Sequence, residues 1–82
     1  MKKLDRKQLV ITARKDLGLN QTDFAKLLGK KQVIVSQWES GDREILDDTI
    51  FRLKFKYENG IQDYDKSLDL FKPYLDEIIG VE

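Results

Sequence analysis

Four side chains between residues 32 and 37 are of the kinds that contact base edges in a DNA groove. They are two amides, a hydroxyl and a branched apolar group: Gln32, Val33, Ser36 and Gln37. At 3.6 residues per turn, their spacing places them on one side of a helix. A glutamine amide pairs best with adenine, and an apolar group suits the methyl group of thymine. The set therefore predicts base reading, and mere solvation of the two glutamines is the plainer alternative.

The elements that would position these side chains are two short helices joined by a tight turn. Asn20 is a good N-cap for the first helix, and Asp23 completes an acidic form of the capping box. Gly29 suits the left-handed position that ends a helix, and Gly41 ends the second helix in the same way. This is the layout of a helix-turn-helix, whose second helix enters the major groove. The apolar positions repeat at helical spacing and form the expected buried faces: Phe24, Leu27, Leu28, Val35 and Trp38.

The stretch from Gln21 to Gly41 resembles the DNA-binding domain of phage lambda-type repressors and Cro proteins, the XRE-type group. The matching positions read Q-T-x-x-A-x-x-x-G-x-x-x-x-x-V-S-x-W-E-x-G. The resemblance extends over roughly residues 5 to 57 and implies an all-α, compact bundle of about five helices. It also implies a sequence-specific, DNA-binding transcriptional regulator of phage or bacterial type. By the same resemblance, Gln21 binds a backbone phosphate.

Charge is divided unevenly along a chain whose net charge is zero. Residues 1–43 hold ten basic and five acidic side chains, Lys2 and Lys3 among them, and residues 44–82 hold five and ten. Basic charge on the helix-turn-helix half suits phosphate binding. Lys30, Lys31 and Arg43 are the expected contributors. A mixed surface with accidental segregation is the alternative.

Composition argues against several other classes of protein. The chain has no cysteine and no histidine, so it offers neither disulfides nor the commonest metal ligands and bases. No paired acid and base, phosphate loop or nucleophile motif stands out. No signal-peptide core or stretch of transmembrane length is visible. We therefore expect a cytoplasmic protein that is not an enzyme and that uses no metal, cofactor or membrane.

One helix is expected before the helix-turn-helix and one after it. The first should run from near Asp5 to Leu17, with Gln8 as the capping partner and Gly18 after it. The later helix should start after Asp47 and end near Asn59-Gly60. The buried stripe expected for the first helix is Leu9, Val10, Ala13 and Leu17.

Two apolar faces are expected on the helix after Asp47. Ile50, Leu53 and Tyr57 share one face, and Phe51 and Phe55 share another. We expect the helix-turn-helix core against one face, and either the C-terminal segment or a partner chain against the other.

The C-terminal segment is amphipathic, and Pro73 should interrupt it because proline lacks an N–H and disfavours helix before it. A turn or short helix is expected at 66–71, followed by a helix that starts at Pro73. We expect one domain, with residues 1–60 as the helix-turn-helix core. Residues 61–82 would pack on that core or form a dimer or partner interface. The expected apolar face is Leu68, Phe71, Leu75, Ile78 and Ile79.

Departures from the family pattern keep a second function open. Lys31 stands where a Ser or Thr cap is usual, and Val33 and Ile34 point outward on the reading helix. Trp38 is expected to anchor that helix in the core, and Glu39 to make a structural polar contact. Exposed apolar residues suit a protein partner, so the alternative is a protein-binding modulator, such as an antitoxin or the partner of a phage repressor. Besides double-stranded DNA, a second copy or another regulatory protein would then bind the candidate interface residues Val33, Ile34, Phe51, Phe55, Leu75 and Ile79.

Overall fold

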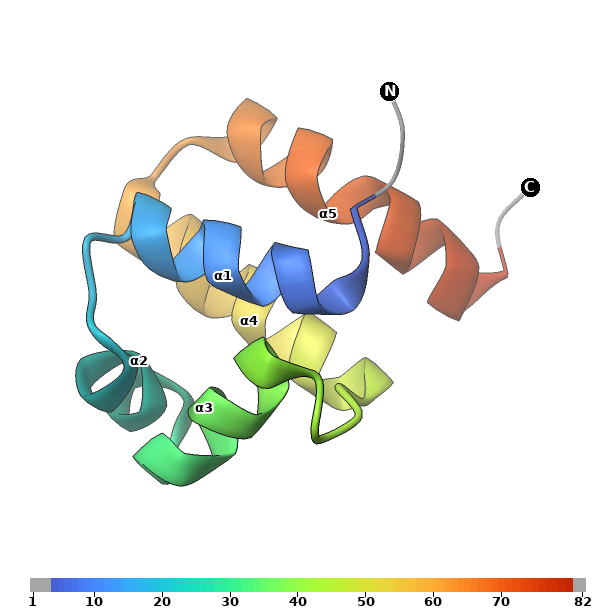
Figure 1. Cartoon of the computed structure of the whole chain (residues 1–82). Coiled ribbons are helices and arrows are strands. Elements are labelled where there is room, and N and C mark those ends of the chain that lie inside the picture. Colours follow the sequence, from blue (N-terminus) through green and yellow to red (C-terminus); the bar gives the residue numbers. More distant parts are fainter. Residues whose placement is uncertain (1–3, 81–82) are drawn as a thin grey trace. The chain divides into compact units, whose positions relative to one another are not determined.

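The structure, a computed structural model, describes residues 4–80 and contains five α-helices there (Figure 1). Their bounds are α1 (Arg6–Asp16), α2 (Gln21–Leu28), α3 (Gln32–Ser40), α4 (Asp47–Ile61) and α5 (Tyr64–Ile79). Residues 4–80 include no β-strand. The prediction of an all-α fold with about five helices is confirmed. Lys2, Lys3 and the last two residues of the C-terminal segment lie outside the described residues.

By its backbone contacts the chain forms two compact units, one that ends at Ile45 and one that begins at Leu46. The first contains α1, α2 and α3, and the second contains α4 and α5. Each unit is described by itself below. The expected partition into a core of residues 1–60 and an accessory segment of residues 61–82 stays a prediction.

In the first unit, side-chain caps start the first two helices as the sequence predicts. Asp5 accepts a hydrogen bond from the backbone N–H of Gln8 at 2.8 Å, and Asn20 accepts one from that of Asp23 at 2.8 Å. α1 ends one residue earlier than expected, so Leu17 is its C-cap and is only half-buried. α3 packs against both α1 and α2. The helices enclose a small apolar core: Leu9, Val10, Ala13, Phe24, Ala25, Leu28, Val35 and Trp38.

The turn between α2 and α3 depends on the backbone of Gly29. Its φ of 67° is left-handed, a conformation that glycine adopts without the strain of a side chain. The N–H of Lys30 then reaches back to the carbonyl of Ala25 at 2.8 Å and closes the end of α2. α3 starts immediately after this turn, at Gln32, and its N-cap residue Lys31 makes no side-chain cap hydrogen bond. The turn therefore fixes the direction in which α3 leaves α2.

In the second unit, α4 differs from its expected bounds at both ends. Asp47 is the first helical residue rather than the cap, in the first turn where the helix dipole favours a carboxylate. The helix continues past Gly60 to Ile61, and Gln62 takes the left-handed conformation, with φ 58°. Glycine permits a helix end without imposing one, and here the N–H of Gln62 still bonds the carbonyl of Glu58 at 2.7 Å.

The predicted break at Pro73 is wrong, because α5 is continuous from Tyr64 to Ile79 with Pro73 inside it. Proline removes only one helical hydrogen bond, the one that an N–H at position 73 would donate to the carbonyl of Asp69. Asp69 is exposed, so water can reach that carbonyl instead. Buried side chains on both sides of the proline hold the two halves in line: Ser67, Phe71 and Tyr74. Of the expected apolar face, Phe71 is buried, Leu68, Leu75 and Ile78 are half-buried, and Ile79 is 63 % exposed.

α4 and α5 pack through one of the two apolar faces of α4. The rings of Tyr57 and Phe71 meet edge to face with centroids 5.4 Å apart, and Ile50 and Leu53 are buried as expected. On the other face, Phe51 and Phe55 remain 43 % and 61 % exposed. The C-terminal helix α5 therefore packs on the Tyr57 face of α4, and a partner chain over Phe51 and Phe55 stays a prediction.

Replacing Pro73 by alanine should stabilise the protein. Alanine restores the missing N–H within an existing helix, and we expect a gain of about 1–3 kcal/mol in the free energy of unfolding. Urea denaturation followed by circular dichroism measures it. Pro73→Gly is the matched control and should gain about 1 kcal/mol less. A loss of stability in Pro73→Ala would show that the proline ring is needed for the packing of α5.

Candidate DNA-binding surface

α3 brings the four predicted base-reading residues to its outer side. Val35 and Trp38 are buried, which confirms both as core residues. Gln32 and Val33 are exposed, Val33 by 50 %, while Ser36 and Gln37 are half-buried. Ile34, expected to point outward, is also half-buried. The arrangement fits a reading helix, and the DNA-contacting role of each residue stays a prediction.

Behind this side of α3 lies an ion pair between α1 and α3. Arg14 donates from Nε to Oε2 of Glu39 at 2.7 Å and from Nη2 to Oε1 at 3.0 Å. Its Nη1 donates to the carbonyl of Leu19 at 2.9 Å, in the connection from α1 to α2. The two side chains are only 16 % and 10 % exposed. The expected structural role of Glu39 is confirmed. Arg14, its partner, also fixes the connection between α1 and α2 through its bond to Leu19.

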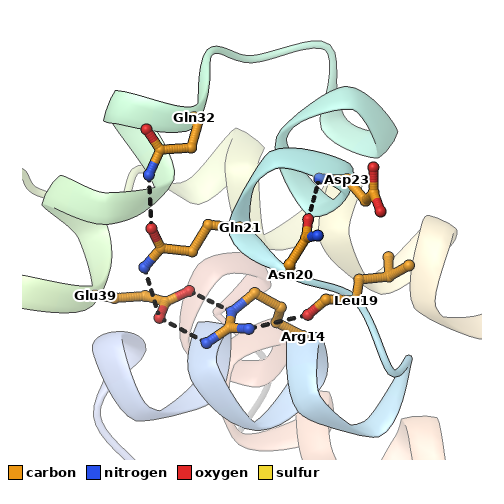
Figure 2. A network of polar contacts seen from close by, with 7 residues as sticks. All are labelled: Arg14, Leu19, Asn20, Gln21, Asp23, Gln32 and Glu39. Carbon is orange, nitrogen blue, oxygen red and sulfur yellow. Dashed lines mark hydrogen bonds and ion pairs between the residues drawn. The ribbon is translucent and has the colours of Figure 1, made fainter.

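Two further hydrogen bonds extend this ion pair to the surface (Figure 2). Gln21 donates from Nε2 to Oε1 of Glu39 at 3.3 Å, and Gln32 donates from Nε2 to Oε1 of Gln21 at 2.7 Å. We call the four side chains, Arg14, Glu39, Gln21 and Gln32, the polar relay. It runs from the inner side of α1 to the first residue of α3.

The direction of every hydrogen bond in the polar relay follows from its two charged members. A guanidinium only donates and a carboxylate only accepts, so the atom of Gln21 facing Glu39 must be its NH₂ group. The carbonyl oxygen of Gln21 then faces Gln32, which must answer with its own NH₂ group. Gln32 is left with one free N–H and its carbonyl oxygen. The partly buried ion pair thus sets the orientation of an exposed amide.

The predicted phosphate-binding residues take different positions. Lys30 and Lys31 are exposed at the turn between α2 and α3. Gln21 is engaged in the polar relay at the start of α2. Arg43 lies in the loop after α3, where its Nε donates to Oε1 of Gln37 at 2.7 Å. The structure brings two predicted phosphate ligands, Gln21 and Arg43, into contact with predicted base readers, and phosphate binding by all four stays a prediction.

Sequence reasoning counted Arg14 only as surface charge and missed its role. A signal was present in the helical spacing. Arg14 follows the buried Val10 by four residues, and Glu39 follows the buried Val35 by four, so each charge lies on the inner stripe of its helix. Opposite charges on two buried stripes predict a pair. The contact between Arg43 and Gln37 had no such signal, because it depends on the path of a loop.

Comparison with known families matches residues 10–53, more than half of the chain, to the Helix-turn-helix family model. The protein belongs to the XRE-type, lambda-repressor-like helix-turn-helix family, a family of DNA-binding regulators. No curated protein and no solved structure matches the chain. Over residues 4–80, no helix is long and apolar enough to cross a membrane.

Breaking the ion pair should destabilise the protein. Glu39→Ala leaves the guanidinium of Arg14 largely buried without a counter-charge, and we expect a loss of about 3 kcal/mol in the free energy of unfolding. The double variant Arg14→Met/Glu39→Leu should recover most of that loss, because well-packed apolar groups can replace a buried pair. Chemical denaturation of the single and double variants measures both. Equal stability of Glu39→Ala and the unaltered protein would contradict a structural role for the pair.

Proposed function

We propose that the protein is a sequence-specific DNA-binding regulator of transcription, of phage or bacterial type, which places α3 in the major groove. The observation that carries the proposal is the exposed Gln32 amide at the end of the polar relay. Its orientation is set before any ligand arrives, as specific recognition requires. Family membership supports DNA as the ligand.

Gln32 in this orientation offers the hydrogen-bonding pattern that adenine needs. Its free N–H can donate to N7, and its carbonyl oxygen can accept from the N6 amino group. The bond to Gln21 uses the other N–H and does not compete. Val33, next along α3 and half-exposed, is placed to contact a thymine methyl group, and Ser36 one turn later to contact a base or a sugar–phosphate oxygen.

The phosphate contacts of this proposal come from the edges of α3. Lys30 and Lys31 are exposed directly before it, where a DNA backbone passes when a helix lies in the groove. Gln21 has one N–H of its amide left after its bond to Glu39 and is the remaining candidate. Such contacts supply affinity that falls with salt, and they carry no base preference.

Two substitutions separate base reading from charge. Gln32→Ala should weaken binding to the selected site by about 1–3 kcal/mol and relax the preference at one or two base pairs. Lys31→Ala should weaken binding to all duplexes alike and reduce the magnitude of the salt slope by about one. Gel shifts with a selected and a scrambled duplex, at several salt concentrations, measure both effects. If Gln32→Ala loses the same affinity on both duplexes, Gln32 does not read bases.

A second candidate function is the binding of another protein, as an antitoxin or as the partner of a phage repressor. Exposed apolar side chains favour this protein-binding function. Val33 is 50 % exposed in the first unit, and in the second unit Phe51, Phe55 and Ile79 are 43 %, 61 % and 63 % exposed. Ile34 and Leu75, both half-buried, are the other candidate contacts. A homodimer would use the same kind of surface.

The double variant Val33→Ser/Ile34→Ser distinguishes the two functions. If DNA covers Val33, the variant should lose affinity only for duplexes with thymine opposite that position, and uracil in place of that thymine should reproduce the loss. The expected effect is about 1 kcal/mol, since a single methyl contact is lost. Intact binding to the selected duplex, together with loss of a stoichiometric protein complex in size-exclusion chromatography, would favour the protein-binding function instead.

A further inference from the structure

The contact between Arg43 and Gln37 gives the second glutamine of α3 a different hydrogen-bonding pattern from the first. Nε of Arg43 donates to Oε1 of Gln37 at 2.7 Å. Since a guanidinium carries only donors, the atom facing it must be the carbonyl oxygen of the amide. The NH₂ group of Gln37 is therefore turned away from Arg43. Charged neighbours set the orientation of both amides. Gln32 uses its NH₂ group within the protein, whereas Gln37 uses its carbonyl oxygen.

The backbone after α3 holds Arg43 in this place. The N–H groups of Asp42 and Arg43 both donate to the backbone carbonyl of Gln37, at 2.9 and 3.2 Å. Gly41 makes this reversal possible with a left-handed φ of 87°. The carboxylate of the neighbouring Asp42 accepts from the hydroxyl of Ser40 at 3.0 Å. The backbone bond from Arg43 to Gln37 and the side-chain bond between them thus hold the two residues together.

Together the side chains of Gln37 and Arg43 present mainly hydrogen-bond donors to a ligand. The carbonyl oxygen of Gln37 accepts from Arg43 through one of its two lone pairs. The positive guanidinium beside that oxygen disfavours a second donor there, so the pair mainly offers a base the N–H groups of the amide and of the guanidinium. Guanine offers two acceptors in the major groove, O6 and N7, whereas adenine offers one acceptor and one donor. A bidentate glutamine–adenine pair needs the N6 amino group of adenine to donate to that oxygen, next to the positive charge of Arg43.

We infer that Arg43 is a specificity-determining residue, which orients Gln37 so that the pair reads guanine while Gln32 reads adenine. This inference rests on the proposed DNA-binding function and refines it. It replaces phosphate binding as the main role of Arg43. Two glutamines on one helix then select different bases because different neighbours hold their amides.

Selection of binding sites from a pool of random duplexes tests the inference. The full-length protein should enrich guanine at one position and adenine at another. Gln32→Ala and Gln37→Ala, selected in parallel, identify which position each glutamine contacts, because each variant relaxes one of them. Guanine opposite Gln37 and adenine opposite Gln32 is the expected result.

The decisive variant is Arg43→Lys, which keeps the positive charge and loses the planar set of donors. The preference for guanine over adenine opposite Gln37 should fall about tenfold, which is within the range for loss of one bidentate contact. The salt slope and the preference opposite Gln32 should stay unchanged. The matched control, Lys30→Met, should lower the affinity for all duplexes and keep the guanine preference. Far-ultraviolet circular dichroism verifies that both variants are folded.

Three outcomes would overturn the inference. Adenine enriched opposite Gln37 by the unaltered protein would show that the amide has the other orientation in the complex. An unchanged guanine preference in Arg43→Lys would assign Arg43 to phosphate binding. Failure of the unaltered protein to enrich any sequence would reject the proposed DNA-reading function itself, and the inference with it.

Discussion

The Arg14–Glu39 ion pair is the interaction on which the geometry of the first unit depends. It joins α1 to α3, and through the carbonyl of Leu19 it also holds the connection that leads to α2. Its members are 16 % and 10 % exposed, so removing either one would leave the other largely buried without a counter-charge. Two acceptors and five donors in fixed positions leave few alternative arrangements around them. Apolar packing brings the three helices together, and the ion pair selects one way of packing them.

Much of the fold was predictable because local rules determine it. Asp5 and Asn20 cap their helices, Gly29 ends α2 and Trp38 is buried, as helical spacing and turn chemistry require. The errors fell where a local preference opposed packing. At Pro73 one missing hydrogen bond weighed less than the burial of Phe71 and Tyr74 on either side of it. The end of α4, at Ile61, lies one residue past the expected Asn59-Gly60.

The candidate site was predictable in its position and less so in its chemistry. Residue types and spacing sufficed to place Gln32, Val33, Ser36 and Gln37 on one helix. They did not reveal which atoms of the two amides remain free, because that depends on contacts between distant segments. Gln32 bonds to Gln21, eleven positions earlier, and Gln37 bonds to Arg43, which lies in the loop after α3. Hydrogen-bonding capacity is thus a tertiary property even where the side chain itself is evident in the sequence.

The polar relay restrains the exposed amide of Gln32 before any ligand binds. A rotation of the Gln32 amide by half a turn would set its oxygen against that of Gln21 and break the hydrogen bond between them. An exposed glutamine normally loses about 0.5–1.5 kcal/mol of conformational entropy when a ligand immobilises it. Gln32 has lost part of that freedom on folding. If Gln32 reads bases as we propose, a matching base would meet an amide already oriented for it, whereas a mismatched base would have to break its bond to Gln21. Under that proposal, restraint at this single position would add to the discrimination between bases.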